Sequence, residues 1–300
     1  MAHTESCFTY YDRRSGQLVK EPIYASPFFR WSYTTVPGGL ATELLFRHRC
    51  VTRLCGWYFK QPWSRRRIPA FVLKYNVNME ESARRLEEFT SFNDFFTREI
   101  DLATRPIPPD HRVCIAPNDG RILGHPVVDA NTTFGIKRHT FNLSRFLRDD
   151  TLAKQYVGGS MVISRFYLQD YHYFHFPDSG TPGPALPIQG KHYALGPYWG
   201  RTPVPWFSEN YRMLTLFDSD HFGQIAMVEI GAFTVGSIQQ RFNPGVRVAK
   251  GARKGFFELG GSTAVLLFQR GAIRLDEDLC ARTEENIETF VRFGESIGKA

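Results

Sequence analysis

The amino-acid sequence predicts an α+β fold, in which an N-terminal helical segment packs on a largely antiparallel, β-rich core of barrel-like or sandwich-like form. Helical patterns are confined to the residues before Pro106, whereas short β-rich runs separated by Gly, Pro and Asp dominate after it. Many short strands without long alternating helices are typical of antiparallel sheets. We therefore expect two regions, a mainly helical one over residues 1–105 and the β-rich core over residues 106–300.

The N-terminal region is expected to open with a polar hairpin over residues 10–22 and then to form helices. Residues 38–58 repeat apolar side chains at helical spacing, and residues 68–75 form a second apolar stretch. Residues 79–89, rich in Glu and Arg, are a third helix candidate. Ser91 is the expected N-cap of the short turn that follows, because a serine oxygen can accept from the first free N–H groups of a helix.

The core is expected to hold short strands and one long loop. The loop covers residues 180–205, which are rich in Pro and Gly, and a loop of this length in a compact domain is usually functional or mobile. The expected strands are residues 113–116, 122–123, 159–165, 213–217, 225–230, 234–238 and 264–269.

The positive charge is concentrated in one window. Residues 41–75 carry the whole net charge of +7, with Glu43 as their single acidic residue, and they also contain many aromatic side chains. Such a block indicates an anionic partner, either a membrane surface or a nucleic acid, although a solvated helix face is an equally common explanation. The candidate contacts are Trp57, Trp63, Arg65, Arg66 and Arg67.

Other features of the composition limit the setting of the protein. No stretch approaches the run of about 18–20 apolar residues that spans a bilayer, so any membrane association is expected to be peripheral. Residues 1–20 are polar, and no secretory signal is expected. The five cysteines form no CxxC pattern, which favours reduced thiols in a cytosolic compartment.

Ser262 is the candidate nucleophile. It follows two glycines in the run Gly-Gly-Ser-Thr, which by itself is typical of a turn between two apolar strands. Glycines adopt backbone angles closed to other residues, so the carbonyl of Gly261 could be presented to the serine hydroxyl under strain. Attack on that carbonyl would move the chain from an amide to an ester, provided that a base activates the serine.

His172 and His175 are the candidate bases, and Asp119 is the candidate carboxylate that orients one of them. If residues 171–175 form a strand, the two rings point to opposite faces, whereas a turn could bring them together. A core histidine and a metal pair are the alternatives, and no further ligands of matching spacing support a metal. The run Asn-Asp-Gly around Asp119 is also a common turn signal.

Together and in this order, these segments resemble the phosphatidylserine decarboxylases. Residues 118–120 are similar to the family's Ala-Asp-Gly motif, with Asn118 in the place of Ala, and residues 171–177 to its Tyr-His-x-x-His-x-Pro motif. Residues 260–263 match the Gly-Gly-Ser-Thr form of its processing site. The opening resembles the compact bacterial branch. The likeness also covers residues 10–16, 91–98, 208–212 and 228–238, with Tyr211 where the family often has Lys or Glu.

The resemblance implies that the chain cuts itself between Gly261 and Ser262. The products would be a beta chain of residues 1–261 and an alpha chain of residues 262–300, which stay together as a heterodimer and are expected to dimerise further. Ser262 would become a covalent pyruvoyl group, the family's cofactor. This group takes up the amine of the serine head group and accepts the electrons that departing CO₂ leaves behind.

The resemblance also implies roles for the other candidates. His175 would be the base for self-cleavage, held by Asp119 as in other nucleophile–base–acid triads, and His172 would act in the decarboxylation itself. No metal is implied.

The expected substrate is phosphatidylserine, converted to phosphatidylethanolamine and CO₂ by a peripheral protein at the cytoplasmic face of the inner membrane. The main alternative is a relative that decarboxylates a free amino acid such as tryptophan, for which the basic block would have no purpose. A nucleic-acid-binding module lacks any base-reading motif, and a non-catalytic scaffold would not need the set Asp119, His175 and Ser262.

Overall fold

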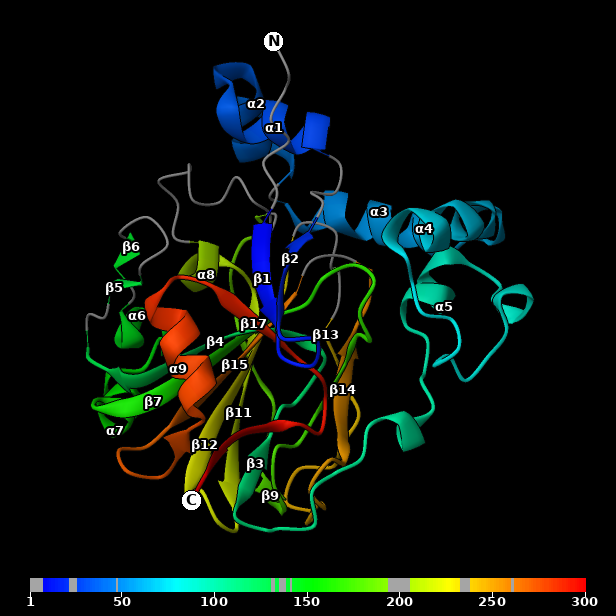
Figure 1. Ribbon diagram of the computed structural model, residues 1–300. Coiled ribbons are helices and arrows are strands. Elements are labelled where there is room, and N and C mark those ends of the chain that lie inside the picture. The colour runs from blue at the N-terminus through cyan, green and yellow to red at the C-terminus, as the bar shows by residue number, and fades with distance from the viewer. Residues whose placement is uncertain are drawn as a thin grey trace.

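The computed structural model describes residues 8–21, 26–46, 48–130, 133–134, 139–140, 142–193, 206–232, 238–259 and 262–300. These residues form an α+β fold, as the sequence predicts. A large antiparallel sheet makes up the body of the molecule, and helices from the N-terminal third lie above it and along one side (Figure 1). The large sheet is open rather than closed into a barrel, because β10 and β2 form its two edges.

The large sheet is antiparallel except where β1 runs parallel to β17. The predicted N-terminal hairpin is confirmed as β1 and β2, and it extends this sheet at one edge. In spatial order the strands are β10 (Leu186–Ile188), β11 (Arg212–Ser219), β12 (Gln224–Ile230), β15 (Thr263–Phe268), β7 (Gly159–Arg165), β4 (Gly120–Val128), β17 (Glu288–Val291), β1 (Phe8–Asp12) and β2 (Gln17–Glu21), with β9 (Gly180–Pro182) paired to β11.

The centre of this sheet is buried on both faces. Successive strand residues point to opposite faces, so neighbouring residues of one strand belong to different hydrophobic clusters. In β15, Val265 and Leu267 pack with Phe146 and other residues of α6 (Leu143–Leu147) and α7 (Asp150–Tyr156). Leu266 belongs to the opposite cluster, which contains Leu279 of α9 (Glu277–Glu284). Every residue of β15 is therefore buried, which explains its continuous apolar sequence.

Three smaller sheets flank the large one. One of them consists of β13, β14 and β8, and its strand β14 leads directly to the segment that contains Ser262. The small sheets are β13 (Ile238–Gln240), β14 (Arg253–Phe257) and β8 (Tyr173–His175); β16 (Arg274–Leu275), β18 (Ser296–Lys299) and β3 (Val113–Ile115); and β5 (Thr133–Phe134) with β6 (His139–Thr140).

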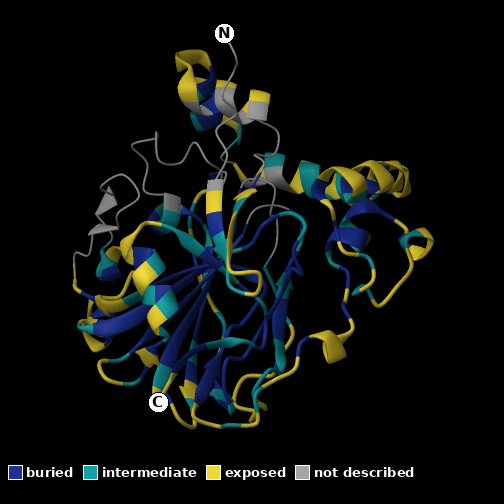
Figure 2. Cartoon of the chain, in the orientation of Figure 1, coloured by how far each residue is buried: buried dark blue, intermediate teal, exposed yellow. Residues whose placement is uncertain are grey.

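The N-terminal helices bury an apolar face against the core and expose the opposite face. Ile68, Phe71 and Phe95 are buried in an aromatic cluster with Tyr167 of the core, while much of the helical surface is exposed (Figure 2). Ser91 caps α5 as predicted, accepting from the N–H of residue 94 at 3.1 Å. The helices are α1 (Ser26–Thr34), α2 (Val36–Ala41), η1 (Thr42–Phe46), α3 (Arg49–Lys60), η2 (Pro62–Arg67), α4 (Ile68–Tyr75), η3 (Leu86–Glu88), α5 (Phe92–Phe96), η4 (Leu102–Thr104) and, beyond the large loop, α8 (Trp206–Glu209).

Two of the helix predictions are wrong in part. The single helix expected over residues 38–58 is divided into α2, the π-helical turn η1 and α3. The helix expected over residues 79–89 is reduced to η3. Backbone groups of residues 81 and 83 form hydrogen bonds with residues 99–101 instead of the bonds of a helix. Ala83 N–H donates to Glu99 O at 3.0 Å, and Glu81 O accepts from Asp101 N–H at 2.9 Å.

The strand predictions are confirmed at six of the seven positions, with shifted ends. The seventh, residues 234–238, lies outside the described residues except for Ile238, which begins β13. The long loop expected over residues 180–205 contains two short strands, β9 and β10, both paired to β11, and its residues 194–205 lie outside the described part of the chain.

Candidate active site

Ser262 lies between β14 and β15, at the entrance to the middle of the large sheet. Its side chain is fully buried, and its hydroxyl Oγ has no hydrogen-bond partner among the described residues. Its carbonyl accepts from the N–H of Phe166 at 3.1 Å. Gly260 and Gly261 lie outside the described residues. Because an unpartnered buried hydroxyl is costly, this atom is a strong candidate for chemistry rather than for structure.

The chain just before the two glycines is held by the N-terminal helices. Leu259 N–H donates to Asn93 Oδ1 at 3.1 Å, and the Leu259 side chain packs in the aromatic cluster of α4 and α5. Lys60 of α3 forms an ion pair with Glu258 at 2.7 Å. The segment 91–98 therefore anchors the chain that leads to Ser262.

His172 is buried and neutral. Its Nδ1 donates to the carbonyl of Asp170 at 2.9 Å, and its ring lies against Phe96, with ring centroids 3.8 Å apart, and against Phe166. Burial, followed by the nearby positive charge of Arg98, lowers the pKa of His172 to about 3. Because Nδ1 carries the proton, Nε2 presents a lone pair, and Nε2 has no partner among the described residues.

His175 is also neutral, but both of its nitrogens are engaged. Its Nδ1 donates to Gly251 O at 2.9 Å, and its Nε2 accepts from the Tyr171 hydroxyl at 3.2 Å. The ring stacks on Phe293 with centroids 3.8 Å apart. Burial lowers the pKa of His175 to about 4.

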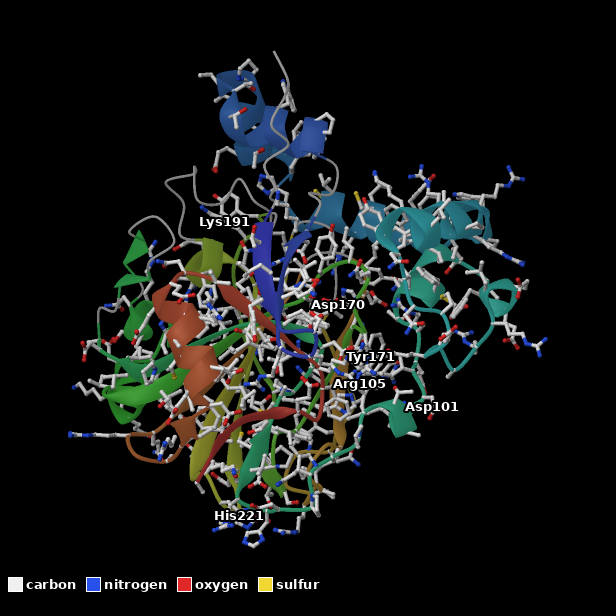
Figure 3. The ribbon with its side chains drawn as sticks, viewed as in Figure 1. Asp101, Arg105, Asp170, Tyr171, Lys191 and His221 are labelled. Carbon is white, nitrogen blue, oxygen red and sulfur yellow. The ribbon has the colours of Figure 1, made fainter. Side chains whose placement is uncertain are left out.

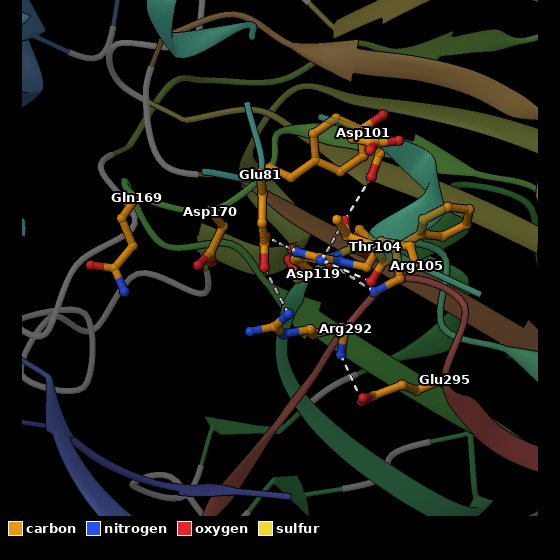
Figure 4. A network of polar contacts seen from close by, with 12 residues as sticks. Glu81, Asp101, Thr104, Arg105, Asp119, Gln169, Asp170, Arg292 and Glu295 are labelled. Carbon is orange, nitrogen blue, oxygen red and sulfur yellow. Dashed lines mark hydrogen bonds and ion pairs between the residues drawn. The ribbon is translucent and has the colours of Figure 1, made fainter. Parts of the chain in front are cut away.

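Asp119 is clamped by an arginine. Its carboxylate accepts from Arg105 Nε at 3.1 Å and Nη2 at 2.7 Å, and from the N–H of Phe293 at 2.8 Å. Arg105 also donates to Glu81 at 2.6 Å, and Glu81 accepts from Arg292 at 2.9 Å (Figure 4). This network of alternating charges fixes both oxygens of Asp119.

The candidates are brought together as two pairs. Asp119 and His175 both contact Phe293, and Phe166 contacts both His172 and Ser262. Within the described residues, no hydrogen bond joins Asp119 to His175 or His175 to Ser262. The two histidines contact different residues, Phe96 for His172 and Phe293 for His175. Only His175 belongs to a strand, because β8 begins at Tyr173.

Tyr171 and Asp170, which accompany the histidines, lie near the middle of the molecule together with Arg105, whereas His221 is at the far end of the core (Figure 3). No sequence pattern predicted a role for Tyr171, Asp170 or Arg105. Tyr171 stands inside the histidine motif, so its position was a usable signal. Arg105 carries no local pattern that would have marked it.

The candidate membrane contacts lie on the outside of the N-terminal helices. Trp57 and Trp63 are 54% and 49% exposed, and the side chains of Arg65, Arg66 and Arg67 are exposed as well. Arg65 donates to the carbonyl of Glu87 at 2.9 Å, and the Arg67 guanidinium lies over the rings of Tyr58 and Phe59. In the part of the chain that the structure describes, no helix has the length and apolar character needed to cross a bilayer.

A buried serine hydroxyl and two neutral histidines are the arrangement expected of an enzyme whose chemistry centres on a serine. Residues 92–299 match the family model described as phosphatidylserine decarboxylase. A phosphatidylserine decarboxylase proenzyme of Clostridium beijerinckii is 38% identical over 288 residues, which cover 96% of this chain and 97% of the relative.

Two further relatives carry the same name. The protein of Chlamydia felis is 38% identical over 291 residues, covering 97% of both chains. That of Chlamydia trachomatis is 40% identical over 290 residues, covering 97% of this chain and 96% of the relative. The chain therefore belongs to the phosphatidylserine decarboxylase family.

The lowered pKa values of the two histidines predict that acid destabilises the fold. Between pH 6.5 and about 4 the unfolded chain binds protons that the folded chain does not, so stability falls as the pH drops. Each histidine should cost about 1.4 kcal/mol per pH unit in this range. Urea denaturation of the uncut Ser262→Ala protein at pH 7.5 and 5.5 measures the loss. Burial also lowers the pKa of His125 to about 4, so adding His172→Gln should remove about a third of the histidine contribution; an equal loss with and without His172 would contradict the prediction.

Proposed function

We propose that the protein decarboxylates phosphatidylserine to phosphatidylethanolamine and CO₂, after it has cut its own backbone between Gly261 and Ser262. Membership of the family supports the reaction, and the name proenzyme, which the relatives carry, supports processing of a precursor. The observation that carries the proposal is the buried, unpartnered hydroxyl of Ser262 at the position that matches the family's processing site.

Self-cleavage would begin when a histidine takes the proton of the Ser262 hydroxyl, whose oxygen attacks the carbonyl of Gly261. The chain moves from an amide to an ester as the nitrogen of Ser262 gains a proton. β-Elimination, with loss of the Cα proton of residue 262 to a base, then releases residues 1–261 with a free carboxylate and leaves a dehydroalanine. The dehydroalanine tautomerises to an imine, which water hydrolyses to the ketone and ammonia. We assign the first proton transfer to His175, which requires Tyr171 to give up its bond to Nε2. Orientation by Asp119 would further require Nδ1 to exchange Gly251 O for this carboxylate.

The site at position 262 fits a pyruvoyl group, because the group forms from Ser262 itself in a buried site whose neighbour Phe166 also packs on His172, a histidine with an unpartnered nitrogen. When present, it supplies an electron sink for the loss of CO₂. His172 is then placed to hold or deliver a proton at Nε2, since its Nδ1 is fixed by Asp170 O. Phe96 and Phe166 keep water away from this nitrogen.

A lipid substrate keeps its acyl chains in the bilayer, so the enzyme must work at a membrane surface. We assign this contact to the exposed face of α3 and η2, where Trp57 and Trp63 accompany Arg65, Arg66 and Arg67. The protein would then be peripheral, on the cytoplasmic face of the inner membrane. A decarboxylase of a free amino acid such as tryptophan would have no use for this face.

Self-cleavage predicts two fragments, residues 1–261 and 262–300. Denaturing gels and the intact mass of purified protein should show both, with the downstream fragment beginning in a blocked group rather than a serine. CO₂ release should be seen with phosphatidylserine and not with free serine or tryptophan. A single uncut chain in active protein would contradict the proposed self-cleavage.

The two histidines should separate maturation from turnover. His175→Ala and Ser262→Ala should remain uncut, because base or nucleophile is missing, and Asp119→Ala should be cut slowly or not at all. His172→Ala should be cut but should decarboxylate about 10²–10⁴-fold more slowly. Gels score cleavage and CO₂ release scores turnover. An uncut His172 variant together with a normally cut His175 variant would reverse the two assignments.

Charge reversal of Arg65, Arg66 and Arg67 to Glu should weaken binding to anionic vesicles. Each basic side chain near an anionic leaflet contributes about 1 kcal/mol, which salt screens. Self-cleavage should be unchanged, since it needs no membrane. Vesicle co-sedimentation at low and high salt is the measurement, and reversal of the exposed Arg274 to Glu is the control. Equal binding by the triple variant and the parent would exclude this face.

A further inference from the structure

We propose that Arg98 binds an oxyanion of the lipid head group inside the active site. The inference rests on the proposed function and names the residue that recognises the substrate's negative charge. Arg98 stands in the segment 91–98, two residues after Phe96, whose ring covers His172. The segment 91–98 resembles the family, but no sequence pattern predicted a role for Arg98.

Among the described residues, Arg98 is a buried cation without an ion-paired carboxylate. Burial lowers its pKa more than the charges of Asp170, Asp119 and Glu81 raise it. Only 4% of the residue is exposed, and no carboxylate within the described residues forms an ion pair with it. Its Nη2 donates to the carbonyl of Gln169 and lies 3.4 Å from the carbonyl of Asp170. Its Nε and Nη1 have no partner in the same part of the chain. Burying an uncompensated charge is expensive, so a site of this kind is completed by an anion.

The guanidinium lies beside the catalytic candidate His172. The carbonyl of Asp170 is shared between them, since it accepts from His172 Nδ1 at 2.9 Å and faces Arg98 Nη2. The charge of Arg98 is also one of the causes of the low pKa of His172, and burial lowers the pKa of Arg98 itself to about 10. The guanidinium carbon lies 5.0 Å from the centre of the Phe95 ring, a cation–π contact.

Three groups of unsatisfied buried atoms are therefore linked through shared neighbours, Asp170 O between Arg98 and His172, and Phe166 between His172 and Ser262. They are the two free nitrogens of Arg98, Nε2 of His172 and Oγ of Ser262. Phe96 and Phe166 join them, because each packs on His172 and Phe166 also bonds to Ser262. A phosphatidylserine head group offers matching chemistry, with acceptor oxygens for the arginine.

The head group carries two oxyanions, the phosphodiester and the carboxylate. A contact with the phosphodiester would be the same before and during loss of CO₂, so its removal would raise KM and leave kcat nearly unchanged. A contact with the carboxylate would stabilise the substrate more than the transition state, so its removal would raise KM and leave kcat equal or higher. Phosphatidylethanolamine keeps only the phosphodiester and therefore distinguishes the two sources.

The experiment uses the mature protein with phosphatidylserine in mixed detergent micelles. Arg98→Gln should be cut as completely as the parent, and its KM should rise about 10- to 100-fold, the value of a hydrogen bond to a charged group. Inhibition by phosphatidylethanolamine should weaken to a similar degree if the phosphodiester is bound and should be unchanged if the carboxylate is bound. Arg98→Lys, which keeps the charge, should recover part of the loss.

Arg84→Gln is the matched control. Arg84 also stacks on a phenylalanine of the aromatic cluster, Phe89, but it pairs with Asp94 at the surface, so KM should not change. A cut Arg98→Gln protein with the parent's KM would overturn the proposal. Failure of both Arg98 variants to be cut would also overturn it, since Arg98 would then support only the turn at Gln169 and Asp170. The proposed function is tested separately, by CO₂ release from the parent.

Discussion

The buried ion pairs of Arg121 are the interaction on which the rest of this structure depends. Arg121, on β4 in the large sheet, pairs with Asp170 ahead of the histidine motif and with Glu21 of β2 at 2.6 Å. Its guanidinium also lies between the rings of Tyr10 and Tyr167. One side chain thus ties the N-terminal hairpin, the sheet and the turn before His172 together. Removing one partner from such a buried pair typically costs about 3–5 kcal/mol, because the other charge is left uncompensated.

The same arrangement decides the protonation of the site. Asp170 and Asp119, the carboxylates nearest the two histidines, are each neutralised by an arginine, Arg121 and Arg105, and neither accepts from an imidazole. Both histidines instead donate from Nδ1 to backbone carbonyls, and burial then keeps them neutral. A neutral imidazole with a fixed tautomer can accept a proton at Nε2, which is what the first step of the proposed self-cleavage needs.

The sequence was sufficient to predict the α+β class and six of the strands, because these depend on local patterns. Short motifs named Asp119, His172, His175 and Ser262 as candidates, and all four are buried. It was insufficient where contacts between distant segments determine the local structure. Residues 79–89 have a helical composition, but hydrogen bonds to residues 99–101 replace the helix. The clamp of Arg105 on Asp119 joins residues without any shared pattern. The split of the N-terminal aromatic residues into buried Phe71 and exposed Trp57 likewise depends on the core against which they pack.

The position of β15 has a consequence for reversibility. This strand lies between β12 and β7 inside the large sheet, and β17, further along the same segment, lies between β4 and β1. A cut before Ser262 would leave the shorter polypeptide threaded through the middle of the longer one, held by strand pairing on both sides. The order of events would then be fixed, since the sheet must assemble from an intact chain. The denatured, cut protein would have to refold from two separate polypeptides, whereas the precursor folds from one. The lifetime of the cut protein would therefore be governed by its unfolding rate rather than by an equilibrium.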